Sequence, residues 1–167
     1  MNRFRSGAII ALIVFCASEI EAQDTAGDLT VRRTATDSIV LSAASIRALP
    51  RVSVRSTDHG KAAAFGGVSL QSVLAAAGIR LDSLRGKALA DVVLIEARDG
   101  YRVAFTLGEL ATDLGGRVVV LADQRDGKPL SPTEGPRRLV VPADGRAARS
   151  VRQVRSITRV QLVERAP

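Results

Sequence analysis

Short β-rich runs separated by turn residues recur along the chain, and this pattern constrains the fold more than any other feature of the sequence. Asp99-Gly100 lies between two such runs and is a strong hairpin signal, because this dipeptide suits the tight turns that join antiparallel strands. The expected strands are residues 29–33, 38–41, 52–55, 91–97, 101–105, 117–121, 139–141 and 151–163. No long strand–helix–strand repeat joins them. The sequence therefore predicts an α+β domain with a mixed sheet rather than a Rossmann fold.

Capping residues mark three short helices. These are expected over residues 43–49, 70–77 and 107–112. Ser42 and Ser69 stand at the N-cap positions of the first two, and Gly78 follows the second helix where a left-handed C-cap is expected. Thr106 with Glu109 three residues later forms a capping-box pattern for the third helix.

The remaining segments read as loops. Residues 57–67 are rich in small side chains and are expected to form a loop, and residues 123–136 a long turn. Tyr101 is expected to pack the core from its hairpin. Of Arg137 and Arg138, which precede a strand, one is expected to face solvent.

The first residues have the order of a secretory signal peptide. Arg3 and Arg5 precede an apolar run over residues 8–17, and Ile20-Glu21-Ala22 offers a cleavage site. The run is too short for a membrane-spanning helix, which needs about 20 residues. We therefore expect a signal peptide over residues 1–22, a single domain over residues 23–167, and a periplasmic or secreted protein with no membrane span after cleavage. An uncleaved anchor is the alternative.

Few residues that ligate metals or act as nucleophiles remain after cleavage. Cys16 is the only cysteine and lies in the signal peptide, so the mature chain has no disulfide, thiolate metal site or cysteine nucleophile. His59 is the only histidine. A zinc or copper site would need carboxylates almost alone, which suits those metals poorly. No metal site is expected from these residues.

Positive charge is concentrated in the last third of the chain. Residues 117–167 carry 11 basic and five acidic side chains, and all but one of the basic residues are Arg. Arginine binds phosphate and carboxylate groups in a bidentate manner, which favours an anion site. The alternative is a solvated arginine-rich surface, which composition alone favours. Nucleic acid is a poor candidate partner, because only four Phe and one Tyr are available for stacking.

Five segments in a fixed order carry a more specific signal. They are a Gly-Val-Ser-Leu helix unit (65–79), an Asp-Gly-Tyr strand–helix unit (99–110), a strand leading to Gly-Lys-Pro-Leu (118–132), Glu-Gly-Pro followed by Arg-Leu-Val-Val-Pro (134–142), and Arg-Ser-Val-Arg before a strand (148–157). This series resembles the oxidoreductase molybdopterin-binding domain family, which has the sulfite-oxidase-type fold. The resemblance implies mixed β-sheets with a β-grasp-like portion and a few short helices.

The resemblance also implies a cofactor. Catalytic members of the family hold molybdenum through a pterin dithiolene and one cysteine thiolate, and they transfer oxygen atoms. Here Ser56 stands near the position of that cysteine, and a serine hydroxyl is a harder and far less acidic ligand. The family's cofactor contacts would fall on Ser56, His59, Arg137, Arg146, Arg149 and Arg152. The missing thiolate leaves open whether a molybdenum cofactor is bound or none.

Three interpretations of function remain. The favoured one is a non-catalytic module that binds a small anionic ligand, a pterin or a periplasmic protein partner. The second is a molybdopterin-dependent oxidoreductase, for oxygen-atom or electron transfer, with Ser56 as an unusual ligand or catalytic residue. The third is an interaction protein whose arginines bind anionic envelope polymers.

Overall fold

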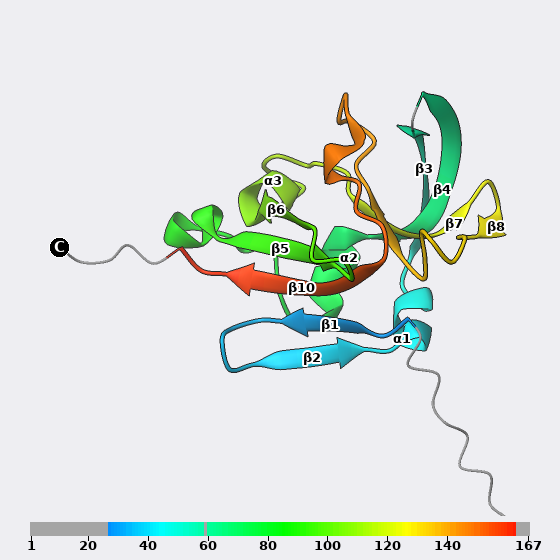
Figure 1. The fold of residues 1–167 in the computed structure, drawn as a ribbon. Helices are drawn as coiled ribbons and strands as arrows, with labels where there is room; N and C mark the ends of the chain where they lie inside the picture. Colours follow the sequence, from blue (N-terminus) through cyan, green and yellow to red (C-terminus); the bar gives the residue numbers. More distant parts are fainter. Residues whose placement is uncertain (1–26, 59, 163–167) are drawn as a thin grey trace, which may run out of the picture.

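The computed structural model describes residues 27–58 and 60–162, which form two five-stranded sheets with short helices between and beside them (Figure 1). Sheet A has the order β2-β1-β10-β5-β6, and sheet B has the order β3-β4-β7-β8, with β9 paired to β7. The strands of sheet A are β1 (Leu29–Arg32), β2 (Ser38–Leu41), β5 (Val92–Ala97), β6 (Arg102–Thr106) and β10 (Val154–Val160). The strands of sheet B are β3 (Arg51–Asp58), β4 (Lys61–Ser69), β7 (Val120–Arg125), β8 (Lys128–Pro129) and β9 (Arg138–Val140).

Sheet A is mixed, as the sequence predicts. β1 runs parallel to β10, with Val31 opposite Ile157, while the other neighbours in the sheet are antiparallel. The first and last described strands are therefore adjacent, so the two ends of the domain are joined by a backbone ladder. The Asp99-Gly100 turn joins β5 to β6 as expected, with Gly100 at a positive φ of 86°.

The helices begin where the capping residues predict. They are α1 (Ala43–Arg47), α2 (Leu70–Ala76) and α3 (Leu107–Leu110), with single 3₁₀ turns η1 (Gly86–Ala90) and η2 (Ala147–Arg149). The Ser69 hydroxyl accepts a hydrogen bond from the Ser72 N–H at 3.0 Å, and the Thr106 hydroxyl accepts one from the Glu109 N–H at 3.0 Å. Gly78 has a φ of 81°, the left-handed C-cap that the sequence predicts.

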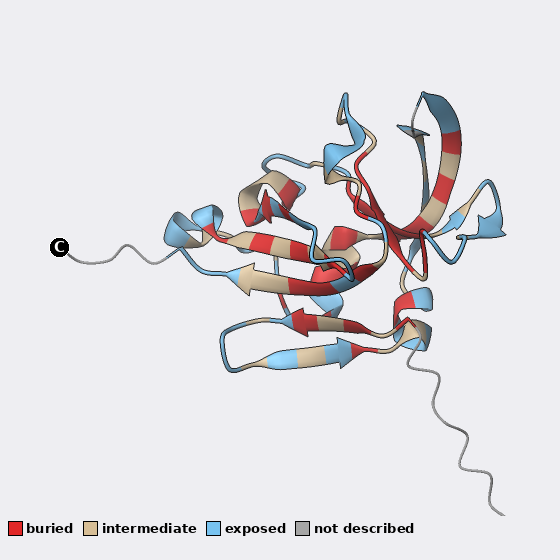
Figure 2. Cartoon of the chain, viewed as in Figure 1, coloured by how far each residue is buried: buried red, intermediate tan, exposed pale blue. Residues whose placement is uncertain are grey.

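The hydrophobic core has two parts, both visible as buried bands along the strands in Figure 2. The larger part lies between the inner face of sheet A and α2, and it includes Val31, Ile95 and Leu74, which are fully buried. The smaller part surrounds Phe65 on sheet B. Within the described residues no helix is long and apolar enough to cross a membrane.

Residues 57–67 do not form the expected loop. They continue β3, turn near Gly60 and form most of β4, paired from Asp58↔Lys61 to Val52↔Gly67. Ala63, Phe65 and Gly67 alternate as buried positions, so the small residues belong to a strand. A Cβ on Gly67 would lie 2.2 Å from the Leu121 carbonyl oxygen, so the close approach of β4 to β7 requires glycine. A strand that packs closely against its neighbour needs small side chains, so its composition resembles that of a loop.

The segment from 117 to 136 also differs from expectation. The predicted strand over residues 117–121 begins later and extends to Arg125, and the turn that follows is tight, at Asp126 and Gly127. The Asp126 carboxylate accepts a hydrogen bond from the Ala64 N–H at 2.9 Å, which attaches this turn to β4.

Candidate functional site

A cleft of about 1020 Å³ opens between the β3–β4 turn, the β5–β6 turn and the segment that follows β9. Thr57 and Gly60 contribute from the first, Asp99 and Tyr101 from the second, and Arg146 and Arg152 from the third. This volume lies at the upper end of the range typical of small-molecule sites. The fold thus places the β3–β4 hairpin, which contains the predicted ligand Ser56, close to Arg146 and Arg152, two of the predicted arginines.

Arg146 and Arg152 present the positive charge of this cleft. Both side chains are exposed and line it. Arg146 stands immediately before η2, and no acidic side chain among the described residues pairs with it. Asp99 contributes a negative charge to the lining, and its carboxylate accepts a hydrogen bond from the Tyr101 N–H at 2.9 Å. The cleft is therefore polar, with a guanidinium available to an anion.

Arg149, predicted with these two, points elsewhere. Its Nε and Nη2 donate to the two carboxylate oxygens of Asp144 at 2.8 and 2.7 Å, and its Nη1 donates to Glu109 at 3.1 Å. The guanidinium also lies 4.8 Å from the centre of the Phe105 ring. Arg149 therefore attaches the 144–149 segment to α3 and is not one of the side chains that line the cleft.

A second arginine completes this network. Arg117 pairs with Glu109 and, through Nη1, with Asp144 at 3.1 Å. The hydrogen bonds from Arg149 lower the pKa of Asp144, and its attraction and that of Arg117 act in the same direction. The same contacts raise the pKa of Arg149. Glu109 thus serves this network instead of completing the reciprocal half of the predicted capping box.

Arg138 lines the cleft, but its charge is neutralised by an ion pair with the buried Glu134. Its Nη1 donates to the buried Glu134 carboxylate, which also accepts from Arg125 at 3.2 Å. Both guanidiniums lie over the Phe65 ring, at 5.1 and 5.5 Å from its centre. Arg138 is 2% exposed and Arg137 is 5% exposed, so the prediction that one of them faces solvent is wrong. Glu134 and Phe65 supply the internal contacts that make burial of Arg138 favourable.

Arg137 lies away from the cleft lining. Its Nη1 is 3.8 Å from the position of a Cβ on Gly27, and this buried nitrogen has no hydrogen-bond partner within residues 27–58 and 60–162. Burial lowers the pKa of Arg137 because it disfavours the charged form, and the attraction of Asp123 offsets only part of this effect. The predicted cofactor role of Arg137 receives no geometric support from this position.

Ser56, predicted as a cofactor ligand, and Tyr101, predicted as a core residue, both lie in other surroundings than expected. Ser56 is half-buried, pairs with Ala63 in the β3–β4 ladder and is not among the cleft-lining residues, whereas Thr57 is. Tyr101 is 50% exposed instead of packing the core, and its hydroxyl donates to the Ala148 carbonyl at 2.7 Å. It therefore braces the wall of the cleft. The Asp99-Gly100 signal predicts that Tyr101 follows a hairpin turn, but no signal in the sequence predicts its hydrogen bond to Ala148.

The donor set of the cleft does not fit a thiolate-bound molybdenum. The part of the chain that the structure describes contains no thiol, and it holds no group of three or more His, Cys, Asp or Glu side chains that could bind a metal ion. His59 and Cys16, with the predicted signal peptide, lie outside the described residues. The side chains that line the cleft suit the anionic part of a ligand rather than a soft metal.

Comparison with known proteins identifies the family. A model of the oxidoreductase molybdopterin binding domain matches residues 19–166, nearly the whole chain. The chain belongs to this family. No curated protein sequence matches it significantly. Among solved structures, the crystal structure of the sulfane dehydrogenase SoxCD from Paracoccus pantotrophus is similar, with a TM-score of 0.61 and 20% sequence identity over 85% of this chain.

Two consequences follow from these matches. The predicted family and its α+β sulfite-oxidase-type fold are confirmed. The matched region spans only 40% of the length of that SoxCD chain. At 20% identity the similarity establishes the fold and not the activity.

Proposed function

We propose that this molybdopterin-binding-type domain works outside the cytoplasm as a non-catalytic binding protein, and that its cleft holds a small anionic ligand such as a pterin phosphate. The supporting observation is the cleft itself, where the exposed Arg146 has no acidic partner among the described residues and the neighbouring donors include no thiolate. Loss of the soft ligand removes the metal chemistry while the anion-binding half of the site remains.

The remaining charges of the site are arranged to support this role. Asp144 lines the cleft but is neutralised by Arg149 and Arg117, and Arg138 is neutralised by Glu134. Asp99 is then the one cleft-lining carboxylate among the described residues that none of these ion pairs neutralises, and the exposed Arg146 is left to attract an incoming anion. Tyr101 and Thr57 add a rigid aromatic wall and a hydroxyl. Such a site orients an anion by charge and hydrogen bonding and offers no group that would react with it.

The first experiment measures what the purified protein carries. The chain from residue 23 onward is produced in a host supplied with molybdate and then analysed for molybdenum and for pterin fluorescence. We expect no stoichiometric molybdenum. Near-stoichiometric molybdenum that survives chelation and gel filtration would contradict the non-catalytic proposal.

Anion binding is tested directly by calorimetric titration with inorganic phosphate and with a pterin phosphate. Arg146→Ala should weaken binding about tenfold or more, because a hydrogen bond to a charged group contributes about 1.5–3 kcal/mol. Arg55→Ala is the matched control, since Arg55 is exposed on β3 and does not line the cleft. Equal losses in the two variants would show only a general effect of net charge.

A second candidate function is a molybdenum-cofactor oxidoreductase with an oxygen ligand. Family membership favours it, and so does the Thr57 hydroxyl, which lines the cleft one residue beyond Ser56. The metal analysis separates the two candidates. If molybdenum is found, Ser56→Ala and Thr57→Val identify the ligand, because only the ligand variant should lose the metal.

The proposed location rests on residues 1–22. Expression of the whole chain in a bacterium, followed by fractionation and mass spectrometry, should give a periplasmic protein that begins at Gln23. A cytoplasmic protein, or one that retains residue 1, would contradict the export proposal.

A further inference from the structure

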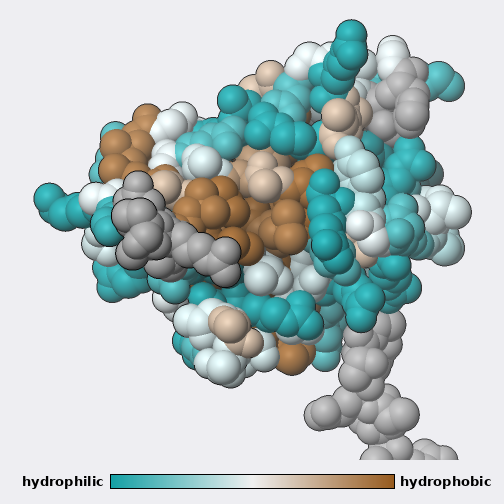
Figure 3. All heavy atoms as spheres, turned by 60° about the vertical axis from the view of Figure 1, so that its left-hand side comes forward, coloured by the Kyte–Doolittle hydropathy of each residue, from teal (hydrophilic) through white to brown (hydrophobic). Residues whose placement is uncertain are grey.

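The outer face of sheet A carries fully or partly exposed aliphatic side chains that no helix or strand of the described residues covers. We call Val92, Leu94, Val160 and Leu162 the aliphatic surface. Val160 and Leu162 are 37% and 56% exposed, and Val92 and Leu94 are half-buried. Figure 3 shows an apolar area in the middle of this side of the molecule. It lies toward the end of β5 opposite to Ala97, which lines the cleft.

The sheet register explains why these residues share one face. Val93 and Ile95 of β5 point into the core, so Val92 and Leu94 point to the opposite side. Val160 of β10 pairs with Val92 and therefore lies on the same side. Leu162 lies just beyond the end of β10 and is exposed. α2 packs on the other face of the sheet, against the same core cluster as Val93 and Ile95 (Figure 1). The helices and strands of residues 27–58 and 60–162 therefore leave the aliphatic surface uncovered.

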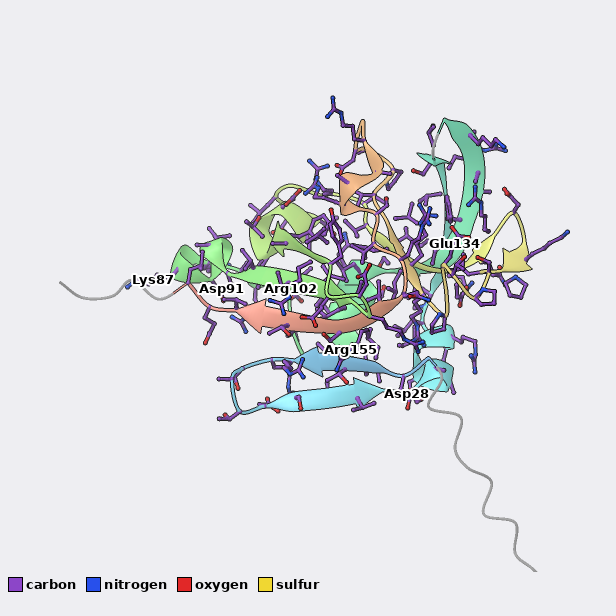
Figure 4. The ribbon with its side chains drawn as sticks, in the orientation of Figure 1. Asp28, Lys87, Asp91, Arg102, Glu134 and Arg155 are labelled. Atoms are coloured by element: carbon purple, nitrogen blue, oxygen red, sulfur yellow. The ribbon has the colours of Figure 1, made fainter. Side chains whose placement is uncertain are left out.

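Two cations lie on this side of sheet A, Lys87 near the aliphatic surface and Arg155 toward the other end of β10, while the acids near the surface are paired. Asp91 pairs with Arg159 at 2.6 Å, and Glu96 pairs with Arg102 at 2.9 Å. Lys87 in η1 and Arg155 in β10 are exposed and have no acidic partner in the described part of the chain. Figure 4 places Lys87 beside the start of β5 and Arg155 near the start of β10, toward the other end of the sheet. The surface thus combines an apolar centre with net positive charge.

We propose that the aliphatic surface docks the protein on a bilayer that contains anionic phospholipid. The aliphatic side chains would enter the interface between headgroups and acyl chains, and Lys87 and Arg155 would contact lipid phosphates. None of the larger clefts in the described residues is lined by these four side chains. A bilayer needs no cavity, whereas a peptide or helix docks into a groove. This role is independent of the ligand in the arginine cleft.

The test uses vesicles of phosphatidylcholine alone and vesicles that also contain phosphatidylglycerol. The chain from residue 23 onward is used, because the apolar run at residues 8–17 would itself enter lipid. Cosedimentation should show binding to the anionic vesicles, weaker binding to the neutral ones, and a decrease at high salt. Absence of binding to the anionic vesicles would overturn the proposal.

Two pairs of variants locate the contact. Val160→Asp with Leu162→Asp should lower the vesicle partition coefficient at least about tenfold, because both hydrophobic contact and charge attraction are lost. Val40→Asp is the apolar control, since Val40 is 59% exposed on β2 of the same sheet but outside the aliphatic surface. Lys87→Glu with Arg155→Glu should lower partitioning by at least about tenfold. Arg55→Glu with Lys128→Glu on sheet B is the control for charge.

The outcomes separate lipid from protein occupants. All these substituted side chains are exposed or partly so, and circular dichroism checks that each variant is folded. Equal loss in variants and controls would show nonspecific attraction of a basic protein and would overturn the proposal. If vesicles do not bind but the aspartate variants abolish self-association in gel filtration, the surface is an interface between copies of the chain, and the lipid proposal fails.

Discussion

Four arginines of the C-terminal third form two groups that differ in their surroundings. Arg138 and Arg149 are held by carboxylates and lie over aromatic rings, at 5.1 Å from Phe65 and 4.8 Å from Phe105. Arg146 and Arg152 are exposed and line the cleft. The sequence is uniformly rich in arginine here, so composition does not separate structural from ligand-facing side chains. Internal carboxylates separate Arg138 and Arg149 from Arg146, because a guanidinium that is paired with an internal acid attracts a ligand less strongly.

Arg138→Met should give the largest effect. Removing one partner of a buried ion pair costs about 3–5 kcal/mol, and Arg125 remains to contact Glu134, so we expect a loss of about 3 kcal/mol in the free energy of unfolding. Urea denaturation measures it. The double variant with Glu134→Gln should cost less than the two single losses together. Additive losses would show that the pair is not coupled.

Arg149→Met should destabilise the domain by a smaller amount. Hydrogen bonds to charged groups contribute about 1.5–3 kcal/mol, and the side chain is partly exposed, so we expect about 1.5 kcal/mol. The 144–149 segment should also exchange its amide protons faster, because Arg149 attaches it to α3. A stability equal to that of the wild type would place Arg149 with the ligand-facing group.

Asp144→Asn should change how stability depends on pH. Because the pKa of Asp144 is lowered below 3.8 in the folded protein, its charged form stabilises the fold above the unfolded pKa, and this stabilisation is lost as pH falls through the folded pKa. The difference in unfolding free energy between wild type and variant should therefore shrink from about pH 5 to pH 3. Thermal denaturation across that range checks it. A difference that grows with acidity would contradict the direction of the pKa shift.

Arg146→Gln should have the smallest effect on stability, within about 0.5 kcal/mol, because its side chain is exposed and has no acidic partner among the described residues. Phosphate should raise the thermal midpoint of the wild type but not of this variant, since only a ligand bound to the folded state stabilises it. A marked loss of stability without ligand would move Arg146 into the structural group.

Much of the fold could be predicted from the sequence because its signals are local. The caps at Ser69 and Thr106 and the turn at Asp99-Gly100 each depend on neighbouring residues, and each is found as predicted. The loop predicted for residues 57–67 is wrong because small side chains suit both a loop and a strand. Contact with Leu121, 54 positions from Gly67, decides between these alternatives.

The candidate site was only partly predictable for the same reason. Arg146, Arg149 and Arg152 are equally spaced in the sequence, but Arg149 meets Asp144 and Glu109 and turns away from the cleft lining. Ser56 was selected by resemblance, yet Thr57 is the residue of β3 that lines the cleft. Tyr101 braces the cleft through Ala148, a contact over 47 positions.

Residue identities and their order are enough to predict the family, the mixed α+β architecture, the helix caps and the absence of a thiolate from the predicted mature chain. These features follow from residue identity and from contacts between near neighbours. The packing of the two sheets is needed to establish which arginines are paired with carboxylates, which residue of β3 lines the cleft and which face of sheet A the described helices leave uncovered. Those outcomes depend on carboxylates, rings and strands that are distant in sequence, and their electrostatic and packing energies arise only when the sheets assemble.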